Sequence, residues 1–420
     1  MLTVKTYEQL VSLCGLLILI FFSGIFSKHP ARINLWQILL GTYLQCVIAL
    51  LVLKWPTGKS SLNWLMEKTI EFLSFTGNGT DFVYGFVPRP PNICGMDGPF
   101  AYTSLPVITF FGALCSLLYY YGVFQWILIK FATLLYYSMG TTAAESLNAI
   151  ASVFLGPTEA AVLVQSSTGT MTRSEIVTTM TAGYSMIDGS LFATYIAFGA
   201  CPVYLIAANF MSAPATLVIS KILHPEVQAS IQKEMKTFRF PPCIKVIAAI
   251  IANLIVYVAL ITMADVCIGW LGSLVGYSDI SFTKIMSWIF YPFAYILGVT
   301  QNHDETMKVA KLIGLKTVLN EFYAYQQMSV MLTNNQLSDR SQMIAIFALC
   351  GYSNFSQIGS QIGIFGALSP KRRKAFVKCA TRSMIGGEIA CFMTACIAGA
   401  IVSEAGGCLP SSNSANCLAV

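Results

Sequence analysis

Long apolar runs recur along most of the chain and are separated by short polar connections. A helix that spans a membrane needs about 20 mostly apolar residues. Six runs have the length of such a helix, and they are 10–27, 34–53, 104–122, 197–220, 245–272 and 377–402. Two further runs, 175–196 and 341–366, are apolar but dotted with Ser, Thr, Asn and Gly. The pattern predicts an all-α integral membrane protein with about eight transmembrane helices.

Two intervening segments, 140–165 and 305–335, have an intermediate character. They are too polar to face lipid along a full span and too apolar for ordinary loops. Irregular backbone at membrane depth is tolerated only where protein or a water-filled cavity satisfies it. We therefore expect broken or re-entrant helices in both segments.

The chain also contains a weak internal repeat. Each copy has a polar break with a Glu, a short polar connector and an interrupted apolar helix. The first copy has these features at Gly156–Glu159, Thr172–Glu175 and Asp188–Ser190, and the second has them at Asn320–Glu321, Ser338–Ser341 and Asn354–Ser356. An odd number of spans per copy would invert the second copy relative to the first. Paired, interrupted segments at matching positions are typical of the binding site of a transporter.

Composition supports a membrane location and excludes several other classes. Hydrophobic residues make up 55% of the 420 residues and charged residues 10%, whereas a soluble domain has about 25% charged residues. This excludes a soluble enzyme, a disordered chain and a nucleic-acid-binding protein. The formal net charge of +6 is mild, so the placement of the charges is more informative than their sum.

Lys and Arg gather in alternate connections, and this bias predicts which connections are cytoplasmic. The basic positions are Lys28, Arg32, Lys130, Arg173, Lys221, Lys233, Lys236, Arg239, Lys245 and Lys371–Lys374. With eight spans, both termini are then extracellular, and we expect a multi-pass protein of the plasma membrane. The long connection 54–103 is predicted to be extracellular, and it contains a glycosylation sequon at Asn78.

The sequence lacks the motifs of the common enzyme classes. The 13 Cys are scattered without metal-ligand spacing, and we expect most of them to fill space inside helices. There is no HExxH, no GxSxG and no phosphate-binding loop. The chain is predicted not to be an enzyme and to need no cofactor, although a passive channel also fits the composition.

Six acidic residues lie within apolar or half-apolar segments, where ionisable groups are costly and usually functional. Glu175 is best explained as a helix cap, and structural pairing is the favoured reading of Glu145 and Glu388. Glu159 and Glu321 lie at polar breaks, where their carboxylates could accept hydrogen bonds from a ligand or bind a cation.

Several long motifs resemble the concentrative nucleoside transporter family. They are Gly140–Asn148, Gly156–Ala160, Met171–Glu175, Leu319–Tyr325, Ala348–Gly359 and Gly366–Arg373. The similarity runs in order from about residue 10 to 402. The resemblance implies a homotrimer that imports nucleosides by coupling to Na⁺ or H⁺. It also implies a scaffold and a moving transport domain, with re-entrant hairpins at about 140–170 and 305–337.

The resemblance also suggests the residues of the site. The base would face Pro157, Thr158 and Glu159, and the ribose would face Glu321, Asn354 and Gln357. Tyr352 could stack on a flat ring. Sodium would be held by Ser152, Met186 and the carbonyls of Leu155 and Ile187.

This chain departs from the family pattern at four of these positions. Pro157 replaces a base-reading Gln, Gln357 a Ser, Ser152 a sodium-binding Asn, and Met186 a sodium-binding Ser or Thr. A thioether is a poor ligand for a hard cation, and an additional acid, Asp188, lies two residues from Met186. Protons could therefore replace sodium, Asp188 could rebuild a cation site, or backbone carbonyls could suffice for Na⁺.

The sequence predicts a secondary active nucleoside symporter. Its expected organisation is two helices and an extracellular loop in 1–103, a first repeat in 104–220, a basic cytoplasmic loop in 221–244, a second repeat in 245–402 and an extracellular tail in 403–420. A nucleobase or other polar ring compound as substrate, and an uncoupled channel or sensor, remain as alternatives.

Overall fold

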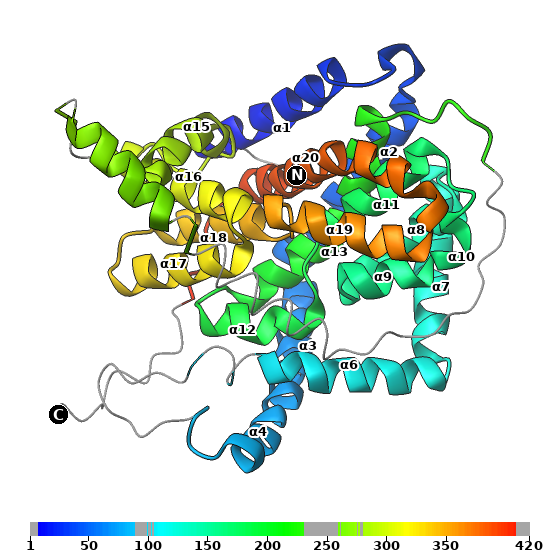
Figure 1. Ribbon diagram of the computed structural model, residues 1–420, viewed down its shortest axis with the longest axis horizontal. Coiled ribbons are helices and arrows are strands. Elements are labelled where there is room, and N and C mark those ends of the chain that lie inside the picture. The colour runs from blue at the N-terminus through cyan, green and yellow to red at the C-terminus, as the bar shows by residue number, and fades with distance from the viewer. Residues whose placement is uncertain are drawn as a thin grey trace.

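A computed structural model describes residues 7–88, 99, 102, 105–230, 259–260, 262–274, 276–277 and 280–408. Regular structure in these ranges is helical, which agrees with the predicted all-α class. Helix α13, Pro202–Leu223, is almost entirely buried and forms the centre of the largest apolar cluster. Figure 1 shows α15–α18 on one side of the molecule and α7–α11 on the other, with α13, α19 and α20 between them.

Four helices in the described part are long and apolar enough to cross a membrane. Two of these candidate spans are α1, Tyr7–Ile25, and α2, Leu35–Ala49, which a π-helical turn η2 extends through Leu50–Lys54; the other two contain α13 and α20, Arg373–Ile401. Helix α1 packs on α20 and α2 packs on α13. The outer faces of α1 and α2 leave large apolar side chains such as Leu17 and Phe21 exposed, as expected of lipid-facing helices.

The region after α2 corrects two expectations. The predicted loop 54–103 contains helices α3, Pro56–Ser74, and α4, Thr76–Tyr84. Lys130 does not lie in a connection, because helix α7, Val123–Met139, runs through it after α6, Leu105–Tyr120. Hydropathy missed α3 because polar and charged side chains interrupt its apolar positions. The side chain of Asn78 is exposed on α4, and its glycosylation stays a prediction.

The first repeat comprises a hairpin and a broken helix. Its elements are α8, Ala143–Phe154; α9, Pro157–Leu163; α10, Gln165–Thr168; α11, Arg173–Ser185; η3, Gly189–Leu191; and α12, Phe192–Ala197. The second repeat follows the same plan with α16, His303–Val318; α17, Glu321–Thr333; α18, Asp339–Leu349; and α19, Phe355–Leu368. Helix α15, Phe282–Ile296, which precedes α16, was not predicted.

The two hairpins point in opposite directions. Glu145, at the start of α8, contacts Lys221 at the end of α13, whereas Glu305, at the start of α16, binds Ser338 just before α18. Gln342, in the first turn of α18, donates to the carbonyl of Gly199, near the opposite end of α13 from Lys221. The predicted inverted repeat of re-entrant hairpins is therefore confirmed.

Several basic residues do gather at one end of the molecule. The backbone N–H of Lys28 donates to the Leu223 carbonyl, 3.0 Å away, and Arg382 donates to the same carbonyl. Arg372, in the short helix η4, Pro370–Arg372, donates to the carbonyl of Met171. The predicted basic positions Lys233, Lys236, Arg239 and Lys245, the start of span 245–272 and most of the tail 403–420 lie outside the described residues.

Two of the cysteines have a role other than filling space inside helices. Cys201 and Cys408 form a disulfide that joins the start of α13 to the C-terminal segment. Cys350, Cys391 and Cys396 are buried and free, as expected. Spacing cannot reveal a bond across 207 residues, because nothing in the intervening sequence indicates that the two segments meet. Disulfides persist in oxidising compartments, which agrees with the predicted extracellular location of this end.

Candidate functional site

Four interruptions of helical structure meet near the centre of the fold. They are Leu155–Gly156, Met186–Asp188, Leu319–Asn320 and Cys350–Asn354. The N–H of Asp188 donates to the hydroxyl of Tyr352, 3.0 Å away, and the Asn354 amide donates to the Glu321 carboxylate at 3.1 Å. Each repeat thus contributes one hairpin tip and one broken helix to the same polar centre.

Local sequence explains why the helices restart at these positions. Pro157 is the first residue of α9, where its missing N–H costs nothing. Asn320 and Asn354 are N-caps whose side-chain oxygens accept from the N–H groups of Tyr323 and Gln357, at 3.0 and 2.9 Å. Asn side chains are preferred caps because they satisfy otherwise unpaired N–H groups at a helix start.

Glu321 and Asn354 form the buried part of the site. Both residues are 2% exposed. One carboxylate oxygen of Glu321 accepts from Asn354, and the other lies 3.5 Å from the Tyr195 hydroxyl. A carboxylate offers about four acceptor positions, so Glu321 retains capacity for hydroxyl groups of a ligand. The oxygen of Asn354 already accepts from Ser356 and from the helix backbone, and Gln357 lies beside it, partly exposed.

The first hairpin contributes a more accessible edge. Pro157, Thr158 and Glu159 are all partly exposed. A Cβ atom on Gly156 would lie 2.6 Å from a carboxylate oxygen of Glu159 and 3.1 Å from one of Asp188. The absence of a side chain at Gly156 therefore allows these two acids to approach the same point, where they could bind a proton or a cation.

The suggested sodium ligands are close together but partly occupied. The Ser152 hydroxyl donates to the Asn148 carbonyl of its own helix at 2.8 Å, and the Met186 side chain is buried. The Ile187 carbonyl accepts from the amide of Asn209 at 2.7 Å. Leu155 ends α8 at the adjoining break.

Asn209, on α13, is a site residue that the sequence reasoning missed. Its amide group also donates to the Val153 carbonyl and its oxygen accepts from the N–H of Ile187, both at 3.0 Å. Asn209 therefore ties the first hairpin to the break after α11. The available signal was an Asn in the middle of a largely apolar helix.

Gln361, on α19, is a second missed residue. It is fully buried, and neither polar atom of its amide has a hydrogen-bond partner among the described residues. A Cβ on Gly183 would lie 2.3 Å from the Gln361 nitrogen and 3.1 Å from the ring of Pro157. Gln361 follows Asn354 and Gln357 at helical spacing, which places all three on one face of α19.

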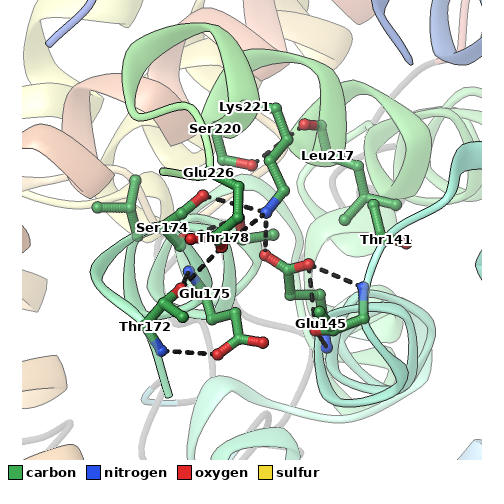
Figure 2. Close-up of polar contacts among 12 residues, drawn as sticks. Thr141, Glu145, Thr172, Ser174, Glu175, Thr178, Leu217, Ser220, Lys221 and Glu226 are labelled. Atoms are coloured by element: carbon green, nitrogen blue, oxygen red, sulfur yellow. Dashed lines mark hydrogen bonds and ion pairs between the residues drawn. The ribbon is translucent and has the colours of Figure 1, made fainter. Parts of the chain in front are cut away.

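The remaining acids have structural partners. Glu145 contacts Lys221 at 2.5 Å, and Glu388 contacts Lys316 at 3.0 Å. Glu175 and Thr172 form a reciprocal cap at the start of α11. Figure 2 shows the Lys221 ammonium between Glu145, Ser174 and Glu226. The interpretation of these acids as caps and ion pairs is confirmed.

Replacement of Asn209 by Leu should destabilise the fold by about 2–4 kcal/mol, because it leaves up to three buried backbone groups unpaired. The melting temperature of the purified protein in detergent measures this loss. Ser212→Ala is the matched control, since Ser212 is buried on the same helix and its hydroxyl has no partner among the described residues. Equal melting temperatures for the two variants would contradict the role given to Asn209.

Two opposed hairpins whose tips meet two broken helices define an inverted-repeat membrane transporter fold. Family profiles match in three adjoining parts: "Na+ dependent nucleoside transporter N-terminus" over residues 14–87, "Nucleoside recognition" over 101–202 and "Na+ dependent nucleoside transporter C-terminus" over 204–399. The chain belongs to the Na⁺-dependent, or concentrative, nucleoside transporter family.

Individual relatives agree with this assignment. "Solute carrier family 28 member 3" of Homo sapiens is 35% identical over 94% of this chain and 60% of its own length. "Sodium/nucleoside cotransporter 1" of Rattus norvegicus is 35% identical over 94% of this chain and 64% of its own length. The chain therefore spans less than two thirds of these curated relatives.

A solved structure matches over nearly its full length. The structure of CNTnw in an inward-facing substrate-bound state has a TM-score of 0.88 and 32% identity, covering 94% of this chain and 98% of that one. A CNTnw variant in an outward-facing state gives a TM-score of 0.89 with 96% and 100% coverage.

Proposed function

We propose that this protein is a secondary active symporter that imports nucleosides across the plasma membrane, driven by a cation gradient. The observation that carries the proposal is the buried contact between Glu321 and Asn354, which joins the second hairpin to the broken helix behind it. An ionised carboxylate can only accept hydrogen bonds, so Glu321 favours a ligand with hydrogen-bond donors over an apolar one. Ribose hydroxyl groups supply the donors that Glu321 lacks.

The base would lie at the first hairpin, along Pro157, Thr158 and Glu159. Pro157 offers no donor, so its ring contributes only apolar contact. The amide of Gln361 lies near that ring and has unused hydrogen-bonding capacity in the described structure. We infer that Gln361 reaches the edge of the nucleobase when the first hairpin shifts on substrate binding. Tyr352 would then pack on the face of the nucleobase.

Transport would proceed by alternating access. The opposed hairpins give each side of the membrane one re-entrant element, and movement of the two repeats against a trimeric scaffold would carry the site between faces. The Cys201–Cys408 disulfide supports an extracellular location for the start of α13 and for the chain segment around Cys408. We also expect the N-terminus to be extracellular, as the distribution of Lys and Arg predicts.

Competition experiments test the substrate class. In vesicles that contain the protein, uptake of labelled uridine should be inhibited by unlabelled uridine and adenosine, and far less by uracil or adenine. Free bases have no ribose hydroxyl groups to donate to Glu321, so they should lose on the order of tenfold or more in affinity. Inhibition by free bases at the same concentrations as nucleosides would instead favour a nucleobase carrier.

Family membership supports Na⁺ as the coupling cation, and H⁺ is the second candidate. The carboxylates of Glu159 and Asp188 converge at Gly156, while the Ser152 hydroxyl and the Ile187 carbonyl already have partners. Imposing a Na⁺ gradient and a pH gradient separately distinguishes the candidates. If H⁺ is coupled, Asp188→Asn should abolish the response to the pH gradient while leaving nucleoside exchange intact, and a response to Na⁺ alone would exclude this second candidate.

A further inference from the structure

A small cavity opens at the basic end of the molecule, distant from the four breaks. Its volume is about 80 Å³, several times the space that one water molecule needs. The lining residues are Lys28, His29, Arg173, Ser174, His224, Glu226, Val227 and Gln228. They come from three separate segments: the connection between α1 and α2, the first turn of α11, and the chain after α13.

The positive charges of this cavity are not neutralised within the described structure. Neither Lys28 nor Arg173 forms an ion pair with any residue in the described ranges. Glu226 also lines the cavity, but its carboxylate accepts from the Thr172 hydroxyl at 2.7 Å and from the Gln228 N–H at 3.2 Å, and it lies 3.8 Å from Lys221. Lys221 in turn is held by Glu145 (Figure 2).

His224 supplies an independent indication of a ligand. Its side chain is 4% exposed, and its Nδ1 has no hydrogen-bond partner among the described residues. Burial, together with the nearby Lys28, Arg382 and His29, lowers the pKa of His224 to about 4, so the imidazole is neutral at physiological pH. A neutral imidazole has one N–H donor, and leaving a buried ring nitrogen unpaired is unfavourable.

We propose that this cavity binds a phosphate group, using Lys28 and Arg173 as cations beside the unpaired Nδ1 of His224, which can form one further hydrogen bond to the phosphate. Arg is well suited because its planar guanidinium can donate two parallel hydrogen bonds to phosphate oxygens. The phosphate can belong to an anionic lipid headgroup of the adjacent leaflet or to a soluble phosphate. The proposal concerns a second site and does not depend on the identity of the transported substrate.

Such binding would add to contacts that already join these elements, such as the bond from the Lys28 N–H to the Leu223 carbonyl. Ser174 already connects α11 to the chain after α13, because its hydroxyl donates to the His224 carbonyl at 2.7 Å. A phosphate between Arg173 and Lys28 would join the first turn of α11 directly to the segment between α1 and α2. Bound anion should therefore raise the thermal stability of the whole protein.

The test uses the full chain in lipid nanodiscs and follows its melting temperature. One arm titrates inorganic phosphate in nanodiscs of phosphatidylcholine alone, and the other compares these with nanodiscs that also contain phosphatidic acid. Stabilisation that grows with inorganic phosphate indicates a soluble ligand, and stabilisation by phosphatidic acid alone indicates a lipid headgroup. Either result supports the site, whereas no stabilisation in both arms overturns it.

Single substitutions distinguish a specific phosphate site from a general effect of positive surface charge. Arg173→Gln and Lys28→Gln should each lower the affinity for whichever probe stabilises the protein by about tenfold. This is the loss typical of one charge-assisted hydrogen bond. Lys374→Gln is the matched control, because it removes one exposed positive charge near the start of α20 and does not line the cavity. An equal loss for Lys374→Gln would show that only the overall positive field matters, and would overturn the proposal.

Discussion

Glu321→Gln is expected to reduce nucleoside uptake on the order of a hundredfold, because a neutral amide replaces the buried carboxylate that we expect to accept from ribose hydroxyl groups. The variant keeps the shape of the side chain. It should therefore retain the Asn354 contact well enough to fold, so the loss should appear in transport rather than in protein amount. Initial rates of labelled uridine uptake, normalised to protein at the cell surface, measure the effect.

Two further variants, Asn354→Ala and a surface control, make this test more specific. Asn354→Ala should lower uptake as well, since it removes the group that holds Glu321 at 3.1 Å and also the cap of α19. Glu71→Gln, on the exposed surface of α3, is the matched control and should transport normally. Normal transport by both Glu321→Gln and Asn354→Ala would mean that the ribose site is elsewhere.

Removal of the buried Lys221 charge should have the largest effect on stability. Lys221→Met leaves the Glu145 carboxylate, which is fully shielded from solvent, without its partner. Breaking a buried ion pair from one side typically costs about 3–5 kcal/mol, whereas replacing both charges with apolar groups is often neutral. Lys221→Met should therefore lower the melting temperature strongly, and the double variant Lys221→Met with Glu145→Leu should recover most of it.

An exposed ion pair provides the comparison. Lys68 and Glu71 are separated by 2.6 Å, closely matching the buried pair, but both side chains are 57% exposed. Lys68→Met should leave the melting temperature unchanged, because solvent screens such a pair. A double variant at 145 and 221 that is no more stable than Lys221→Met would contradict the explanation by unpaired charge.

Much of this fold could be predicted because a membrane imposes strong rules on sequence. Runs of about 20 apolar residues identify α1, α2, α13 and α20, and the polar breaks near Glu159 and Glu321 identify the hairpins. Helix α3 was missed because polar and charged residues interrupt its apolar positions, and α7 was missed because Lys130 was assigned to a cytoplasmic connection. Amphipathic or short helices lack the long apolar run on which that prediction depends.

The site was harder to predict than the fold. Its acids could be found from their position in apolar segments. Their spatial arrangement could not, because Glu159 and Asp188 both approach the space that a side chain at Gly156 would fill. Asn209 and Gln361 lie on helices that otherwise read as packing surfaces, so their orientation towards the breaks could not be inferred. The Cys201–Cys408 bond likewise depends on the course of the chain rather than on local sequence.

The central claim is that the protein accumulates nucleosides against a concentration gradient by coupling to a cation. The most direct measurement is the ratio of internal to external uridine in proteoliposomes that contain only this protein. With an inward Na⁺ or H⁺ gradient the ratio should rise well above one, and it should return to one when an ionophore dissipates the gradient. A ratio that reaches one and never exceeds it under either gradient would contradict the symporter account.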